Sequence, residues 1–98
     1  MVSIKIVDPA IVEKFRQILA SENDEDAVFR IKETKVGGGC KSHMELLVGI
    51  DEVEDEDQQL QVDGLPFVIS EDVIDSYGSS YEIYTDTDKG MPAVRALG

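Results

Sequence analysis

Apolar and polar side chains alternate along several short stretches of the chain, a pattern typical of strands that bury one face. These stretches are residues 2–6, 27–32, 44–51, 60–62, 65–69 and 81–84. Asp63 and Gly64 separate two of the stretches, and an Asp-Gly dipeptide in that position indicates a two-residue hairpin. The alternation therefore predicts a chain in which strands predominate.

A helical repeat follows the first strand. Four apolar residues recur there at helical spacing and form one stripe: Ile11, Phe15, Ile18 and Leu19. Asp8 is a suitable N-cap, and Pro9 suits the first helical position because its missing N–H has no helical partner to lose. We expect this helix to run to about Ser21.

A second, shorter helix is expected near residue 70. Ser70 is a suitable N-cap, residues 71–75 continue the helix and Gly78 ends it. The predicted order is strand, helix, four strands, helix, strand. Because no repeated strand–helix–strand unit appears, we expect an α+β fold with a mostly antiparallel or mixed sheet, folded over as two small sheets. Residues 86–98 predict a loosely ordered tail.

The composition is that of one small globular domain, residues 1–98, with 42% hydrophobic and 31% charged residues. Its 21 acidic residues against 9 basic ones give a formal net charge of −12. That charge repels phosphate backbones and anionic lipids, so we expect no binding to nucleic acid or membrane surfaces. It suits cations and basic partner proteins.

Cellular location is inferred from two features of the sequence. We expect no transmembrane helix or secretory signal, because no long apolar run occurs. The single cysteine excludes an intrachain disulfide and agrees with a reducing compartment. We therefore expect a cytoplasmic protein.

An acidic run occupies residues 51–57. Such a cluster could bind Ca²⁺, but it lacks the spaced oxygen ligands and the central glycine of an EF-hand loop. The run therefore predicts a solvated, mobile loop.

The most distinctive segment places three glycines before the only cysteine and the only histidine. Gly37, Gly38 and Gly39 allow a sharp turn; Cys40 follows directly, and His43 lies three residues further on. The segment joins two predicted strands, so we expect Cys40 at or near the tip of a hairpin. Thiolate and imidazole both bind transition metals, which makes Cys40 and His43 candidate metal ligands.

Conventional enzyme chemistry has little support in this sequence. With one histidine, no Ser-His-Asp or Cys-His-Asn set can be assembled. The glycine run is not followed by Gly-Lys-Ser/Thr and opens no helix, so it does not fit a phosphate-binding loop. We expect a protein that is not an enzyme.

Several segments together resemble the HesB-like family, the A-type carriers of iron–sulfur cluster assembly. The segments are Asp8-Pro9-Ala10, Val36-Gly37-Gly38-Gly39-Cys40 and Tyr81-Glu82-Ile83, within a similar order of elements over residues 2–85. The resemblance implies a compact mixed β fold with flanking helices, often dimeric or tetrameric. It also implies binding of iron or of a [2Fe–2S] or [4Fe–4S] cluster, and its transfer to apo-proteins.

The family uses three cysteines, and this chain departs from that pattern. Cys40 corresponds to the first, whereas the Cys-Gly-Cys pair near the carboxyl terminus has no counterpart. Such clusters are normally held by four thiolates, with imidazole the best-known substitute. A symmetric homodimer would supply Cys40 and His43 twice, and external thiols such as glutathione could also complete the set.

Three function classes remain open. The first is an iron–sulfur cluster or iron carrier with a reduced ligand set, acting with assembly or client proteins. The second is a HesB-fold paralogue without a cluster that serves as a protein-interaction or regulatory module. The third is a thiol-reactive protein, in which Lys35 and Lys41 beside Cys40 favour the thiolate.

Overall fold

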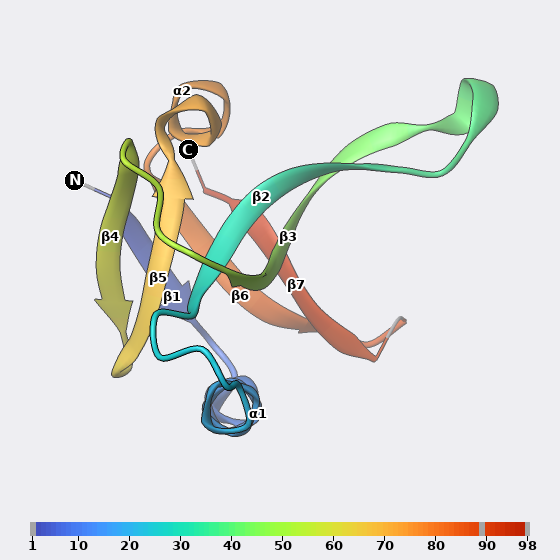
Figure 1. Ribbon diagram of the computed structural model, residues 1–98. Helices are drawn as coiled ribbons and strands as arrows, with labels where there is room; N and C mark the ends of the chain where they lie inside the picture. Colours follow the sequence, from blue (N-terminus) through green and yellow to red (C-terminus); the bar gives the residue numbers. More distant parts are fainter. Residues whose placement is uncertain (1, 89, 98) are drawn as a thin grey trace.

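The computed structural model describes residues 2–88 and 90–97 (Figure 1). Within them the chain forms seven strands, two α-helices and one short 3₁₀ turn. The elements are β1 (Ser3–Ile6), α1 (Pro9–Ala20), β2 (Val28–Val36), η1 (Gly39–Lys41), β3 (His43–Asp51), β4 (Asp57–Val62), β5 (Leu65–Ser70), α2 (Glu71–Tyr77), β6 (Ser80–Asp86) and β7 (Met91–Ala96). None of the described helices has the length and apolar character needed to cross a membrane.

The strands form two small sheets, one in the order β1-β6-β7 and the other in the order β3-β2-β5-β4. Each sheet is mixed, because β1–β6 and β2–β5 are parallel pairs while the other neighbours are antiparallel. Figure 1 shows α1 at one end of the two sheets and α2 at the other. The expected α+β fold with two mixed sheets is confirmed.

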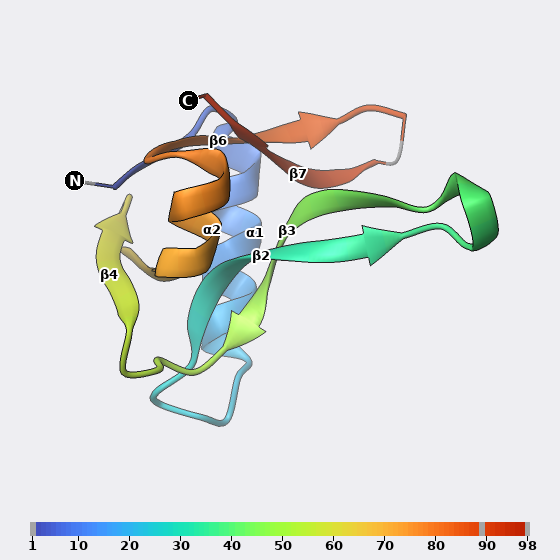
Figure 2. The same ribbon diagram turned by 90° about the horizontal axis from the view of Figure 1, so that it is seen from above.

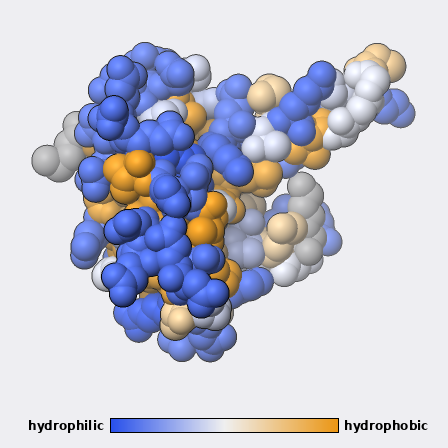
Figure 3. All heavy atoms as spheres, in the orientation of Figure 1, coloured by the Kyte–Doolittle hydropathy of each residue, from blue (hydrophilic) through white to orange (hydrophobic). Residues whose placement is uncertain are grey.

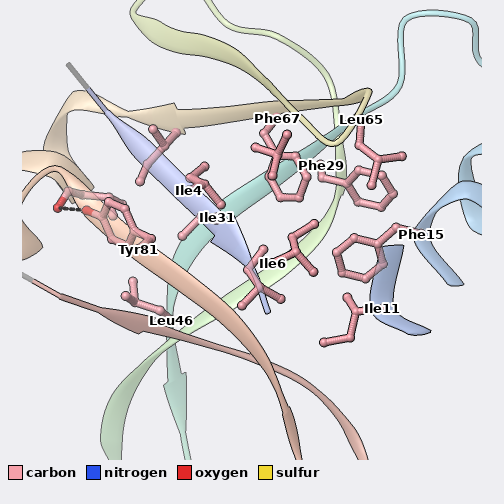
Figure 4. Close-up of a cluster of buried hydrophobic side chains, with 14 residues drawn as sticks. Ile4, Ile6, Ile11, Phe15, Phe29, Ile31, Leu46, Leu65, Phe67 and Tyr81 are labelled. Carbon is pink, nitrogen blue, oxygen red and sulfur yellow. Dashed lines mark hydrogen bonds between the residues drawn. The ribbon is translucent and has the colours of Figure 1, made fainter. Parts of the chain in front are cut away.

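A single apolar core joins both sheets and the first helix (Figure 4). At its centre the ring of Phe15 stacks on that of Phe29, with centroids 4.6 Å apart. Phe67 of β5 lies 5.4 Å from Phe29, so three elements meet at one aromatic cluster. Ile31 and Ile83, one from each sheet, are fully buried. Burial of these side chains is the main force that holds the sheets together.

The local signals for helix ends and for the hairpin are confirmed. The Asp8 carboxylate accepts a hydrogen bond from the N–H of Ala10 at 3.0 Å, and the Ser70 hydroxyl caps α2. Asp63 and Gly64 take φ values of 51° and 81°, the two positive values that a type I′ hairpin requires. Each of these features depends only on neighbouring residues.

The prediction of a loosely ordered tail is wrong for Met91–Ala96, which form strand β7. This strand pairs antiparallel with β6 from Tyr81↔Ala96 to Asp86↔Met91. The polar and glycine signals before it belong to a turn, in which the N–H of Gly90 donates to the carbonyl of Asp86 at 2.7 Å. Proline is tolerated in β7 because the strand lies at the edge of its sheet.

The prediction of a solvated loop at residues 51–57 is also wrong for its two ends, which bind Arg30. The guanidinium donates from Nε to Asp51 Oδ2 and from Nη1 to Asp57 Oδ1, both at 2.8 Å. It also donates to the carbonyl of Glu52 at 2.9 Å. The Asp57 side chain is only 2% exposed. This network therefore ties β2, β3 and β4 together at one end of their sheet.

The β2–β3 hairpin extends beyond the body of the protein. We call residues 32–47 the arm; its outer end stands clear of the body in Figures 1 and 3, whereas Leu46 at its base is buried in the core. Its register runs from Lys32↔Leu47 to Val36↔His43. Because both faces of the outer arm lack packing from the body, the side chains near its tip are exposed.

Candidate functional site

The tip of the arm is built by glycines in two specific conformations. Gly37 and Gly39 have φ values of +87° and +63°, a region that L-residues with a Cβ rarely occupy. A Cβ on Gly37 would also lie 3.1 Å from the carbonyl oxygen of Lys41. Gly38 is extended and has open space around it. Two of the three glycines therefore shape the turn, and the third does not.

Cys40 lies in the 3₁₀ turn at the tip, and its side chain is exposed. Two hydrogen bonds close the turn. The Lys41 N–H donates to the carbonyl oxygen of Gly38 at 3.4 Å, and the Ser42 hydroxyl donates to the carbonyl oxygen of Gly39 at 3.2 Å. Figure 2 shows that this tip is remote from both helices. The thiol is therefore presented to other molecules rather than packed inside its own chain.

His43, the first residue of β3, is also exposed and is held by a carboxylate. Its Nε2 atom lies 2.7 Å from Oε1 of Glu45, two residues along the same face of the strand. A carboxylate that accepts from one ring nitrogen selects the tautomer and leaves the other nitrogen free to bind a metal. The arrangement makes Nδ1 the ligand atom that His43 can offer.

One chain does not provide a complete metal site. Among residues 2–88 and 90–97, no group of three or more His, Cys, Asp or Glu side chains is placed to hold an ion. Cys40 and His43 give two ligands. An iron–sulfur cluster is held by four protein ligands, and a single tetrahedral metal ion also has four ligands. Any metal bound at the tip therefore requires ligands from a second molecule.

A groove between β3 and β7 is the other notable surface, and the sequence did not predict it. It has a volume of about 340 Å³. Residues of both strands line it, among them Met44, Leu46, Met91 and Ala93, together with Tyr84 of β6. The groove was missed because one of its two walls, β7, was expected to be a loose tail.

Comparison with known proteins gives a fold neighbour but no family. No family model matches the sequence, and no curated protein matches it. The structure is similar to the solution NMR structure of a protein from Aquifex aeolicus, a structural genomics target, with a TM-score of 0.58. The two are 28% identical, and the match covers 94% of this chain and 89% of that chain. The likeness supports the α+β fold and assigns no activity.

Proposed function

We propose that this protein binds iron or an iron–sulfur cluster through Cys40 and acts as a carrier in cluster assembly. The observation that carries the proposal is the exposure of the only thiol at the tip of a projecting arm. The resemblance of the Gly-Gly-Gly-Cys segment to the HesB-like family gives the class of cargo. The role is one of binding and transfer rather than enzyme catalysis.

The site is completed by a second copy of the chain. Two arms that meet at their tips supply two Cys40 thiolates and two His43 imidazoles, a four-ligand set suited to a [2Fe–2S] cluster or a single iron ion. Glu45 holds each imidazole so that Nδ1 faces the metal. A symmetric dimer of this kind uses the same surface of each subunit.

The setting follows from the same chemistry. A chain with one unpaired cysteine suits a reducing compartment, so we place this activity in the cytoplasm. Apo-proteins that accept the cluster, and proteins that load it, would be the partners. The net charge of −12 favours partners with basic surfaces.

A second candidate function is a protein-interaction module that has kept the scaffold without the metal. The observation that favours it is the incomplete ligand set of a single chain within the described residues. In that case the arm and its neighbouring groove serve partner proteins directly.

Anaerobic reconstitution with ferrous iron and sulfide separates the two candidates. The expected result is a visible charge-transfer absorption, with iron and sulfide bound in proportion to Cys40 and a shift from monomer to dimer in light scattering. Cys40→Ser should abolish all three, whereas Gly38→Ala, at an extended and open position of the same turn, should retain them. A colourless, metal-free monomer after reconstitution would reject the carrier and leave the interaction module.

A further inference from the structure

We propose that Tyr77 is a positioning residue, which sets the direction of the arm and therefore the place at which Cys40 is presented. It does so by holding Glu33, near the base of the arm, against the end of α2. The direction of the arm is a property of the single, metal-free chain. Its consequence for iron binding rests on the proposed function, in which two tips must meet.

The arm needs an anchor on its β2 strand, because β2 loses one of its two neighbours where the arm begins. The parallel pairing of β2 with β5 ends at Ile31↔Ile69. From Lys32 to Val36, β3 is the only strand among the described residues that pairs with β2. A two-stranded hairpin by itself is only marginally stable. The direction of the arm therefore depends on what holds its base.

Two contacts hold the base of the arm, one on each strand. Glu33 of β2 lies directly opposite Leu46 of β3, so the two side chains share one face of the arm. Leu46 is 8% exposed and belongs to the core. The Oε2 atom of Glu33 accepts a hydrogen bond from the Tyr77 hydroxyl, which lies 44 residues further along the chain. The core therefore anchors β3, and Tyr77 anchors β2.

Tyr77 is itself fixed to the body of the protein. Its side chain packs against the hydrophobic core. It is the last residue of α2, which ends where the Gly78 N–H donates to the carbonyl of Ile74 at 2.8 Å. The carbonyl of Gly78 in turn accepts a hydrogen bond from the hydroxyl of Tyr81 at 2.6 Å, and Tyr81 is 1% exposed. The donor is thus held in place independently of the arm.

The chemistry of the pair suits an anchor at an exposed place. A hydrogen bond to an ionised carboxylate is about twice as strong as one between neutral groups. The bond to Glu33 also raises the pKa of Tyr77 above its ordinary value of 10.0, so the hydroxyl keeps its proton at neutral pH and remains a donor. Strand β2 continues for about 10 Å beyond Glu33, so a small rotation at the base becomes a large displacement of Cys40.

The test measures the distance from the tip to the body by electron–electron double resonance on metal-free protein. One spin label is attached to Cys40 and the other to Gln59→Cys, an exposed position on β4. We expect a narrow distance distribution in this doubly labelled parent. Tyr77→Phe should widen the distribution about twofold, because the hairpin then lacks its anchor on β2. Tyr84→Phe is the matched control and should keep the parent width, since the Tyr84 hydroxyl makes no hydrogen bond within the described residues.

Two variants of the acceptor separate the hydrogen bond from other roles of the side chains. Glu33→Gln keeps a side-chain oxygen that can accept from Tyr77 and should keep the narrow distribution. Glu33→Ala removes the acceptor and should widen the distribution as Tyr77→Phe does. A second label pair lies wholly within the body, at Gln59→Cys and Gln17→Cys in a Cys40→Ser background. Its distance distribution should be unchanged by Tyr77→Phe.

Several results would overturn the proposal. They are equal widths in Tyr77→Phe and Tyr84→Phe, a narrow distribution in Glu33→Ala, and equal widening of the body pair and the tip pair. The last result would mean that loss of the hydroxyl loosens the whole fold.

Iron binding provides the functional measurement. In a parent that binds iron, Tyr77→Phe should bind it at least threefold more weakly than Tyr84→Phe, and equal affinities would overturn the positioning role. The distances are measured without metal, so the two proposals can fail separately. A parent that binds no iron but shows the expected widths would reject the carrier and retain Tyr77 as the residue that directs the arm.

Discussion

Nη1 of Arg30 lies 2.8 Å from Oδ1 of Asp57, and the two side chains are 9% and 2% exposed. The pair links β2 to the start of β4 across the intervening β3–β4 loop. Because Arg30 also bonds Asp51 and the Glu52 carbonyl, both charges are satisfied where water has little access. Removing one partner would leave the other charge buried and uncompensated.

We therefore predict that Asp57→Asn lowers the free energy of unfolding by about 3 kcal/mol, measured by urea denaturation at pH 7. Glu82→Gln is the matched control, since it removes a carboxylate from an exposed pair with Arg95. Exposed pairs contribute about 0–1 kcal/mol, so the control should change little. Equal losses in the two variants would mean that burial of the Arg30 network does not matter.

The same pair predicts how stability depends on pH. The hydrogen bond from Arg30 lowers the pKa of Asp57 below its ordinary value of 3.8 in the folded protein. A carboxyl group with a lowered folded pKa stabilises the protein above its unfolded pKa and loses that contribution as the pH falls through the folded pKa.

Unfolding measured from pH 6 down to pH 2 should therefore show a steep loss of stability below about pH 4 in the parent protein. In Asp57→Asn the curve should be shallower over the same window, because the residue no longer titrates. A parallel pair of curves would show that the acid sensitivity arises from other carboxylates.

The pKa of Glu52 is shifted in the opposite direction to that of Asp57, so its effect on stability has the opposite dependence on pH. Its side chain approaches Asp24, and the hydrogen bond and repulsion between the two carboxyl groups raise the pKa of Glu52. A raised carboxyl pKa means that the folded state loses stability as the pH rises through that value. Glu52→Gln removes this charge but keeps the backbone carbonyl that binds Arg30.

We expect Glu52→Gln to raise the midpoint of thermal unfolding at pH 7 and to leave it unchanged at pH 3. Glu56→Gln removes a charge from the same acidic run and is the control. If both variants raise the midpoint equally, the benefit comes from lower net charge rather than from relief of the contact with Asp24.

Local features of this fold could be predicted from the sequence, and long-range ones could not. The N-cap at Asp8 and the turn at Asp63 and Gly64 depend on two to four neighbouring residues, and both are confirmed. Parallel pairing of β1 with β6 joins residues nearly eighty positions apart, such as Ser3 and Ser80. No local pattern encodes such a partner, so the alternation of side chains predicts strands but not their order.

The same limit applies to the candidate site. The position of Cys40 at a hairpin tip follows from the glycines and the flanking strands, and the structure places it there. The His43–Glu45 contact was accessible in principle, because residues two apart on a strand share a face. The groove and the burial of Arg30 could not be predicted from the sequence, because each depends on strands that the whole fold brings together.

The glycines at the tip differ in what they tolerate. Gly37→Ala places a Cβ at a positive φ and 3.1 Å from a backbone oxygen, so it should destabilise the end of the arm by about 1–2 kcal/mol. Gly38→Ala, at an extended position with open space, should be close to neutral. Amide hydrogen exchange of residues 34–36 and 43–45 should accelerate only in the first variant. Equal rates in both would show that the turn does not depend on the conformation of Gly37.

Glu45 offers the sharpest test of how the tip would bind metal. It touches His43 and would act by holding the imidazole, as carboxylates behind metal-binding histidines do. Glu45→Gln should therefore weaken iron binding roughly tenfold to a hundredfold, while the Cys40-dependent absorption band still forms at high iron concentration. Glu33→Gln removes the same charge from the other strand of the arm and should have little effect. Equal weakening by the two variants would indicate a general electrostatic attraction for the cation, and no change in either would remove His43 from the ligand set.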